Sequence, residues 1–547
     1  MSASDRTEPA LAHAIGAMDT ELLEQTIGDN LDDTVHLHRE REAMVEMASG
    51  RRWTYGELLA DVELLARGLA AAGIVTGDRV GIWAPNCAEW TMVQFATAKL
   101  GAILVTINPA YRTHELAHVL NQSGVRMIVV AESFRLSNYP AMVEEVLDDC
   151  PALSRVVVIG QASWEELLHG AHQVTHARLK EIQASLSPDD PINIQYTSGT
   201  TGFPKGATLS HRNILNNGFF VGEGCSYTEE DIICLPVPFY HCFGMVMGNL
   251  GASSHGACTV IPSPGFDAAK TLTAIREEQC TSVYGVPTMF IAQWELIERG
   301  DFAVEDLASV RTGIMAGSLC PASVMRKLIE AGIEELTICY GMTETSPVST
   351  QTSPDDPFDK VVGTVGRVGP HLEIKIVDPL TRETLPRGQA GEFCTKGYSV
   401  MLGYWEEPEK TAEAITDGWM ATGDVGVMDE DGYVEITGRL KDVVIRGGEN
   451  IYPREIEEFL LTHPDVVDAQ VVGVPDAKYG EELMAWVRMR SGTTALTAPA
   501  LRDFASGKLA HYKVPRYVQV IDEFPMTVTG KVRKIDLRDQ GEKLLPD

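Results

Sequence analysis

The sequence predicts an α/β protein: a large N-terminal domain of layered α/β subdomains with a β-barrel-like part, then a small mobile α+β domain. Short apolar runs such as "RVGIWAP", "GAILVTINP" and "RMIVVAE" alternate with helical stretches such as "AEWTMVQFATAKLGA", as in parallel sheets. The 547 residues are also too many for one hydrophobic core. Near the C-terminus the order of elements changes to helix, strand, strand, helix, strand.

The elements follow this plan along the chain. Residues 1–50 are acidic and weakly patterned, so we expect an extension packed loosely on the main body. From Trp53 apolar residues recur at helical spacing, and the α/β alternation begins. Around 371–400, "HLEIKIVDP" and "GEFCTKG" predict a β-ribbon or barrel closed by Gly and Pro turns. We therefore place an extension at 1–50, the main domain at 51–438 and a lid domain at 439–547.

Composition narrows the class of protein. The net charge of −32, from 45 basic and 77 acidic residues, argues against nucleic-acid binding. No run of about 18 apolar residues occurs, so we expect no transmembrane segment and leave peripheral membrane contact open. Ten cysteines without a C-x-x-C pair, and a start without a leader pattern, predict a cytoplasmic protein. The number of subunits stays open, a homodimer included.

The stretch "YTSGTTGFPKGATLSH", residues 196–211, predicts a phosphate-binding loop. From Thr197 to Gly206 it places three glycines, four Thr/Ser hydroxyls and one lysine, which offers donors to an anion without side-chain bulk. It does not fit the Walker A pattern at any register. A strand is expected before it, and Ser210 is expected to cap a helix after it. A solvated turn is the alternative for the loop alone.

Further motifs follow in order: "YGMTE" at 340–344, "GWMATGDVG" at 418–426, "GRLKD" at 438–442 and "PMTVTGK" at 525–531. Together with the loop they resemble the adenylate-forming (ANL) superfamily of acyl-CoA synthetases, peptide-synthetase adenylation domains and luciferases. The resemblance implies that ATP activates a carboxylic acid as acyl-AMP with release of pyrophosphate. It also implies Mg²⁺ as cofactor and transfer of the acyl group to CoA.

The resemblance assigns nucleotide contacts residue by residue. Those implied for the β- and γ-phosphates are Thr197, Ser198, Gly199, Thr200, Thr201, Gly202 and Lys205. Those implied around adenine and the α-phosphate are Gly317, Tyr340, Gly341, Met342 and Thr343. Glu344, with Thr200, is expected to hold Mg²⁺, which prefers few carboxylates plus phosphate oxygens. A solvated loop acid is the alternative for Glu344.

The resemblance also implies roles near the C-terminal domain. Asp424 and Arg439 are expected to bind the ribose hydroxyls, with a turn residue as the alternative for Asp424. Lys531 is expected to bridge the carboxylate and the α-phosphate, and only its Thr-Gly-Lys context separates it from Lys534. Lys441 matches the family's hinge position. Implied to line the CoA tunnel are Gly447, Gly448 and Glu449, for which a simple turn is the alternative.

For the acyl group, His241 is expected at the gate near the reacting carboxylate, with a structural histidine as the alternative. The predicted pocket is Tyr240, Phe243, Gly244, Tyr284, Gly285 and Met315. It contains no charge for an amino group, which argues against amino-acid substrates. The stretch around it looks most like medium-chain and broad-range fatty acyl-CoA synthetases. Aryl and other acids, an acyl-AMP ligase that serves a carrier protein, and an inactive nucleotide-binding regulator remain alternatives.

Overall fold

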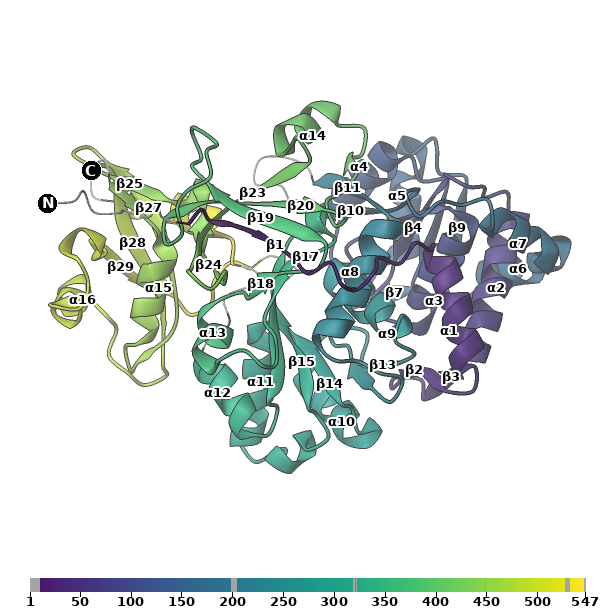
Figure 1. Cartoon of the computed structure of the whole chain (residues 1–547), viewed down its shortest axis with the longest axis horizontal. Coiled ribbons are helices and arrows are strands. Elements are labelled where there is room, and N and C mark those ends of the chain that lie inside the picture. Colours follow the sequence, from purple (N-terminus) through teal and green to yellow (C-terminus); the bar gives the residue numbers. More distant parts are fainter. Residues whose placement is uncertain are drawn as a thin grey trace, which may run out of the picture. The chain divides into compact units, whose positions relative to one another are not determined.

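The computed structural model describes residues 10–197, 204–317, 320, 322–447, 449–526 and 532–545. Within these residues the chain forms two compact units. Unit 1 takes the described parts of 1–12, 375–393 and 422–547, and unit 2 takes 13–374 and 394–421. Figure 1 labels the helices and strands. In the described part of the chain, no helix is long and apolar enough to cross a membrane.

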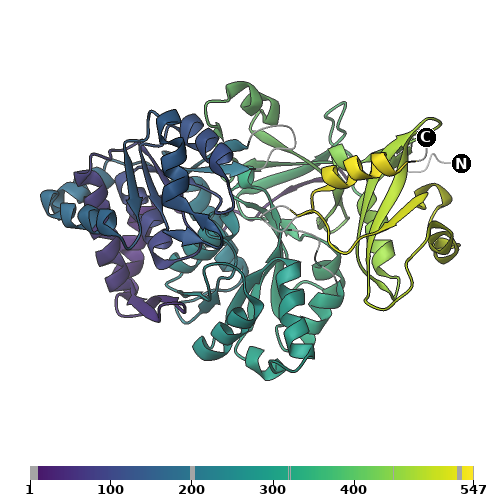
Figure 2. The same ribbon diagram turned by 180° about the vertical axis from the view of Figure 1, so that it is seen from behind.

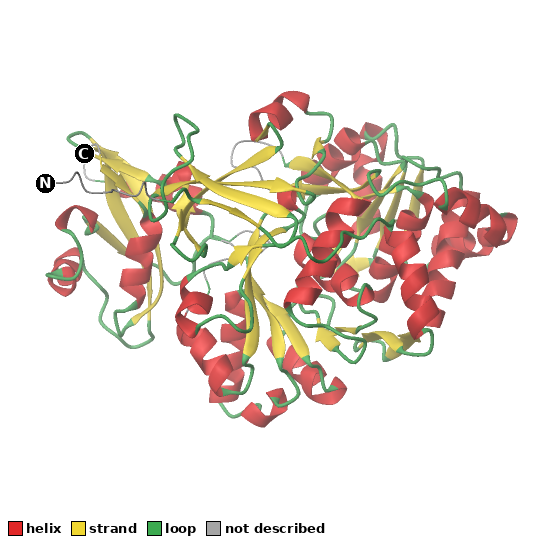
Figure 3. Ribbon diagram, viewed as in Figure 1, coloured by secondary structure: helices red, strands yellow, loops and turns green. Residues whose placement is uncertain are grey.

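Unit 2 contains a seven-stranded sheet with helices on both faces (Figures 1 and 3). In order across the sheet its strands are β21 (Gly403–Tyr404), β11 (Lys205–Ser210), β10 (Pro191–Thr197), β5 (Ile103–Thr106), β4 (Arg79–Trp83), β6 (Met127–Val130) and β9 (Arg155–Val158). The last five run parallel. One face packs on α2 (Tyr55–Ala71), α3 (Ala88–Leu100), α6 (Ala162–Gly170) and α7 (His176–Gln183). The other packs on α4 (Thr113–Ser123) and α5 (Tyr139–Val146), which lie in the blue segment seen from behind in Figure 2.

A nine-stranded sheet completes the parallel framework of unit 2. Its strands in order are β18 (Arg367–Val368), β17 (Val348–Gln351), β16 (Glu335–Gly341), β15 (Thr312–Ala316), β14 (Ser282–Gly285), β12 (Ile232–Cys234), β13 (Cys258–Ile261), β2 (Glu42–Glu46) and β3 (Arg51–Thr54). The strands from β16 to β2 run parallel. The helices in this part of the sequence are α8 (His211–Gly224), a π-helix (Phe243–Leu250), α9 (Gly251–Ser253), α10 (Ala268–Glu278), α11 (Pro287–Glu298), α12 (Ala322–Glu330) and α13 (Phe358–Gly363).

Each parallel sheet contains a point where the direction of strand addition reverses beside its first central strand. In the seven-stranded sheet the chain passes from β4 to β5 on one side and then returns across β4 to β6. In the nine-stranded sheet it passes from β12 to β13 and returns across β12 to β14. At such a switch point the loops after the two strands diverge to opposite faces and leave a crevice at their carboxyl ends, the usual ligand position in open α/β sheets.

Helix starts follow the local sequence. Ser210 caps α8 as predicted: its hydroxyl accepts a hydrogen bond from the Asn213 backbone N–H, and the Asn213 side chain bonds back to the Ser210 N–H. Thr54 and Glu57 form the same reciprocal capping box on α2.

The prediction that residues 1–50 pack loosely was wrong for residues 27–46. Helix α1 (Ile27–His38) and strand β2 belong to the main body, and Ile27, Leu31 and Met44 are buried in its largest hydrophobic core. The fully buried Lys99 ammonium also binds the Asp32 carboxylate of α1 at 2.6 Å. The acidic residues that made this stretch look solvated do not all face solvent: Asp29 and Asp32 are half-buried, and both accept hydrogen bonds from the Gln183 side chain of α7.

The β-structure expected at 371–400 is present as β19 (Leu372–Val377) and β20 (Ala390–Gly397). Both strands, and β23 (Trp419–Met428), run from one unit into the other. In unit 1, β23 pairs antiparallel with β24 (Val434–Arg439). The remaining elements before β24 are β1 (His13–Ile15), β7 (Ser133–Phe134), β8 (Ser137–Asn138), α14 (Pro408–Ala414) and β22 (Ile415–Thr416).

The C-terminal part of unit 1 has the predicted order of elements. It runs α15 (Pro453–Leu461), β27 (Val466–Asp476), β28 (Gly480–Met489), α16 (Ala498–Ala505) and β29 (Tyr517–Val520), flanked by β25 (Val444–Arg446), β26 (Glu449–Ile451) and α17 (Lys534–Leu544). Its sheet has the order β26, β25, β28, β27, with β29 on β28. A separate core lies between this sheet and its helices α15 and α16. The lid boundary at residue 439 stays a prediction.

Candidate active site

Glu344 lies in a buried turn directly after β16. Its side chain is only 6% exposed, and its Oε1 accepts a hydrogen bond of 2.9 Å from the Tyr404 hydroxyl. Its carbonyl oxygen accepts a second bond of 2.9 Å from the Met401 N–H. Both the side chain and the backbone of Glu344 are therefore fixed by the segment 401–404, and the carboxylate is oriented rather than solvated.

Lys205 contacts the same tyrosine. It opens β11 opposite Thr197, the last residue of β10, and its Nζ lies 4.7 Å from the centre of the Tyr404 ring. Burial and the Glu344 carboxylate raise the pKa of the Tyr404 hydroxyl, so this hydroxyl stays a proton donor at neutral pH. One aromatic residue thus holds a cation against its face and a carboxylate at its hydroxyl.

Sequence reasoning did not single out Tyr404. It reaches this position because β21 pairs with β11, which sets Tyr404 opposite Ala207. The only local signal is that a tyrosine follows a glycine in "MLGYW", a pattern too common to select it. The pairing of β21 with β11, which are nearly 200 residues apart in sequence, was needed to find it.

Two substitutions of Tyr404 test this arrangement. Tyr404→Phe removes the bond to Glu344, and we expect kcat/KM for ATP to fall about tenfold or more, because hydrogen bonds to charged groups contribute about 1.5–3 kcal/mol. Tyr404→Leu also removes the ring beneath Lys205, which is expected to cost a further factor of about three. Pyrophosphate release at varied ATP measures both. A phenylalanine variant with wild-type kinetics would contradict the role of the hydroxyl.

Several predicted residues lie outside the described part of the chain: Ser198, Gly199, Thr200, Thr201, Gly202, Gly448 and Lys531. The described residues on either side of the phosphate loop are neighbours, since Thr197 and Lys205 pair across β10 and β11. Strands β10 and β11 therefore form an antiparallel pair, and β11, which begins at Lys205, is a strand that the sequence did not predict.

The predicted adenine contacts share one edge of the nine-stranded sheet. Gly317 follows β15 with φ of +90°, a conformation that favours glycine, and Tyr340 and Gly341 end the adjacent parallel strand β16. Met342 follows, and its N–H donates to the Pro347 carbonyl at 3.0 Å. Thr343 and Glu344 come next. The motif "YGMTE" therefore begins at the end of β16 and ends in the turn that holds the buried carboxylate.

Except for Met315, the predicted acyl residues lie at the switch point between β12 and β14. Tyr240 and His241 lie in the segment after β12, and Gly285 ends β14. The His241 Nδ1 accepts the Phe243 N–H at 3.1 Å, which fixes the ring at the start of the π-helix. A Cβ on Gly244 would lie 2.3 Å from the Pro238 carbonyl oxygen, so only glycine fits at that turn.

Tyr284 and Met315 were both predicted to line the pocket, but their side chains lie on opposite faces of the sheet. Tyr284 is fully buried, stacks on Phe243 with ring centres 5.5 Å apart, and donates to the Met247 carbonyl at 3.1 Å. Met315 belongs to the other hydrophobic core, on the opposite face of the sheet. The register pairs Tyr284 with Ile314 and Gly285 with Met315, which places the two side chains on different faces.

A buried polar link, which the sequence did not indicate, joins strand β10 to the π-helix that begins at Phe243. The Cys242 thiol donates to Gln195 Oε1 at 3.0 Å, and Gln195 Nε2 donates to the Met245 sulfur at 2.8 Å. Burial first, and then the Glu344 carboxylate, raise the pKa of Cys242, which keeps it a thiol. Gln195 lies two residues before Thr197, where β10 ends. Its hydrogen bonds with Cys242 and Met245 therefore hold the end of β10 against the π-helix.

Unit 1 carries the predicted ribose contacts. Asp424 is 7% exposed and lies opposite Arg439 in the pairing of β23 with β24, with Oδ1 3.0 Å from Nε. Partial burial of the Lys441 ammonium and the nearby Arg439 guanidinium lower the pKa of Lys441.

The residues predicted to line the CoA tunnel lie at a hairpin later in unit 1. Arg446 forms a two-point ion pair with the buried Glu482 and lies opposite Glu449 in this hairpin. Gly447, with φ of +61°, makes its turn.

Comparisons with known proteins show the family of the chain. Residues 31–405 match the family described as AMP-binding enzyme, and residues 455–531 match the AMP-binding enzyme C-terminal domain. The chain is 47% identical to YngI of Bacillus subtilis (strain 168), over 95% of this chain and 98% of that protein. It is 45% identical to the mitochondrial medium-chain acyl-CoA ligase ACSF2 of Danio rerio, over 96% and 89%. The structure of ATP-bound MatB from Rhodopseudomonas palustris superposes with a TM-score of 0.83 at 30% identity, over 95% of this chain and 100% of MatB.

Proposed function

The chain belongs to the AMP-binding enzyme family and is an AMP-forming acid–CoA ligase, and from this premise we propose that its acid is a medium- to long-chain fatty acid. In the first step the carboxylate oxygen bonds to the α-phosphorus of ATP and pyrophosphate leaves. In the second the CoA sulfur bonds to the acyl carbon, AMP leaves, and the thiol loses its proton. We place both steps in the cytoplasm.

The observation that carries the site assignment is the arrangement of Lys205, Tyr404 and Glu344. It sets a cation against the ring face of one phenol and an oriented carboxylate at the hydroxyl of the same phenol, next to the strand that begins at Lys205. Phosphoryl chemistry needs fixed charges rather than a nucleophile of the protein, because catalysis is mostly positioning and charge stabilisation. The single buried carboxylate fits Mg²⁺, which takes one or two carboxylates plus phosphate oxygens.

Mg²⁺ would be held by Glu344 and Thr200, and when bound it neutralises charge on the phosphate oxygens. The chain's own residues do the rest. Lys205 and the loop hydroxyls orient the β- and γ-phosphates, Asp424 and Arg439 orient the ribose, and Lys531 bridges the two reacting anions. Lys441 acts as the hinge that exchanges Lys531 for the 447–449 turn before CoA attacks.

The fatty-acid assignment rests on the apolar acyl segment and on the relatives. The residues at the acyl switch point are aromatic, small or sulfur-containing: Tyr240, Phe243, Gly244 and Met245. Such a lining stabilises a hydrocarbon chain and gives an amino or second carboxyl group no partner. Zebrafish ACSF2, 45% identical, is a medium-chain ligase.

A panel of straight-chain acids from C2 to C18, with benzoate and cinnamate, tests the substrate class. We expect the highest kcat/KM for medium-chain acids, with a gradual fall on either side, because each methylene contributes only about 0.8 kcal/mol of burial. Pyrophosphate release measures it. A preference for an aryl acid would support the aryl alternative, and pyrophosphate release without acyl-CoA when CoA is the sole thiol would support an acyl-AMP ligase.

A further inference from the structure

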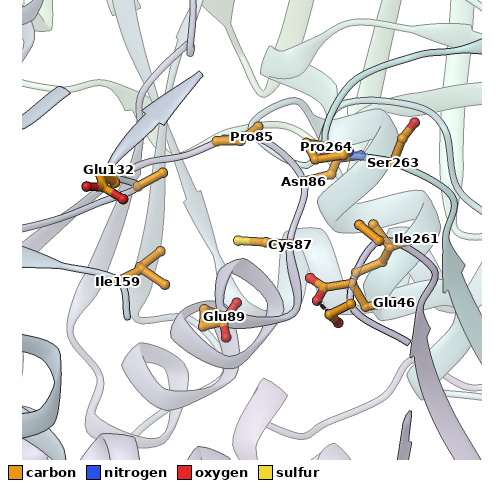
Figure 4. Close-up of a pocket in the computed structure, with 13 residues that line it drawn as sticks. Glu46, Pro85, Asn86, Cys87, Glu89, Glu132, Ile159, Ile261, Ser263 and Pro264 are labelled. Carbon is orange, nitrogen blue, oxygen red and sulfur yellow. Dashed lines mark hydrogen bonds between the residues drawn. The ribbon is translucent and has the colours of Figure 1, made fainter. Parts of the chain in front are cut away.

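The second switch point, between β4 and β6, opens on a cavity. Its walls come from residues directly after the parallel strands of both sheets: Pro85 to Cys87 after β4, Ala131 and Glu132 after β6, Ile159 after β9, and Ser263 after β13 (Figure 4). None of the residues assigned to ATP, CoA or the acid lines it. The fold therefore offers two ligand positions of the same topological kind, and the proposed reaction uses one.

The cavity is large enough for a small organic molecule. Its volume is about 270 Å³, and an apolar protein cavity of about 150 Å³ already binds benzene. Apolar side chains supply much of the wall, namely Pro85, Ala131, Ile159, Ile261 and Pro264. A compact ring or short branched chain would be desolvated on several sides there.

The charged side chains that line the cavity are all carboxylates, those of Glu46, Glu89 and Glu132. Glu46 is buried and satisfied, since it accepts the Ala88 N–H at 2.9 Å and pairs with Arg51 at 3.2 Å. Arg51 also pairs with Glu89 at 2.7 Å. Glu132 is exposed at the mouth, and among the described residues its carboxylate has no ion-pair partner. Three carboxylates against one guanidinium leave an excess of negative charge that repels acids and attracts a cation.

We propose that this cavity is a second ligand site, which binds a small primary amine with a compact apolar body. The ammonium lies at Glu132 in the mouth, and the apolar body fills the space between Ala131, Ile159 and Ile261. The site is selective against the fatty acid, ATP and CoA, because all three are anions.

Asn86 connects this site to the acyl site. It is buried, its Nδ2 donates to the Val237 carbonyl at 2.8 Å, and its Oδ1 accepts the Phe239 N–H at 2.9 Å. These bonds hold the backbone immediately before Tyr240 and His241. A ligand that shifts the Asn86 side chain therefore also shifts the backbone segment that carries His241, the residue expected at the gate.

Cys87 provides a built-in reporter of occupancy. It lines the cavity and is partly exposed, whereas the other nine cysteines of the chain are buried. Burial, and then the Glu89 carboxylate, raise the pKa of the Cys87 thiol, so its alkylation is slow and is followed over an extended time course at mildly alkaline pH. The experiment measures alkylation of Cys87 in the full-length protein by iodoacetamide, followed by peptide mass spectrometry, with benzylamine as the probe. We expect benzylamine to slow alkylation at concentrations about tenfold lower than benzyl alcohol, the same ring without the charge. Phenylacetate, with the opposite charge, is expected to give no protection.

Two variants and one competition complete the test. Glu132→Gln, at an exposed position, should weaken the benzylamine effect several-fold and leave that of benzyl alcohol unchanged. Ala131→Phe should abolish protection by filling the cavity; if it lowers the melting temperature, Glu132→Gln decides alone. Saturating ATP and octanoate should not displace benzylamine. Equal protection by amine and alcohol, an unaltered Glu132→Gln variant, or displacement by ATP and octanoate would each overturn the proposal, and none depends on whether the fatty-acid assignment is correct.

Discussion

Glu344→Gln is expected to lower the rate of acyl-adenylate formation by a factor on the order of 10²–10³, the loss seen when one preorganised charge-stabilising group is removed from an active site. The amide keeps the size of the side chain and an oxygen for the Tyr404 hydroxyl, so the buried turn should remain folded. What is lost is the negative charge that Mg²⁺ requires. Pyrophosphate exchange in the presence of octanoate measures the step.

Glu413→Gln is the matched control, because Glu413 is an exposed glutamate of the same unit. It should leave exchange unchanged. If Glu344→Gln also retains its rate at limiting Mg²⁺, the buried carboxylate serves structure and the metal assignment is wrong. A KM for Mg²⁺ that rises while the melting temperature stays constant would separate metal binding from a folding defect.

Lys531→Ala is expected to reduce adenylation by a similar factor, on the order of 10²–10³, because it removes the cation that brings two anions together. Thioester formation from supplied acyl-AMP should be spared, since the α-phosphate is already joined to the acid. The two half-reactions are measured separately, as pyrophosphate release without CoA and as acyl-CoA formation from synthetic octanoyl-AMP.

Lys534→Ala distinguishes the assigned lysine from its neighbour. Lys534 begins α17, and its Nζ lies 2.6 Å from the Glu457 carboxylate, so it already has a structural partner. Its loss should lower thermal stability slightly and leave adenylation near the wild-type rate. Equal loss of both half-reactions in Lys531→Ala, or a larger adenylation defect in Lys534→Ala, would contradict the proposed role.

The sequence was sufficient where structure is local. Ser210 as a helix cap and the order of elements after residue 453 follow from spacing and side-chain chemistry that act over a few residues. It also placed Asp424 and Arg439 in motifs that prove to be cross-strand neighbours. Family membership followed from five motifs in one order.

It was insufficient where position depends on pairing between distant strands. Tyr404 meets Glu344 and Lys205 only because β21 adds to β11. Met315 has the composition of a pocket residue, but the register of β14 and β15 turns it to the other face. The helix at 27–38 has few apolar residues, and its acidic residues are typical of a solvated segment. Its burial depends on contacts with distant parts of the chain, such as the pair between Asp32 and the buried Lys99, which the local sequence does not indicate.

The way the chain passes between its two compact units limits which part can swivel. It passes at residues 12/13, 374/375, 393/394 and 421/422, and three of these passages lie inside strands. A part of the molecule that the chain enters and leaves at four places cannot rotate about a single point without breaking the hydrogen bonds between those strands. After β24 only one tether remains, the short turn Leu440–Asp442 that leads into β25. A reorientation between two half-reactions would have to be absorbed there, in three residues of backbone.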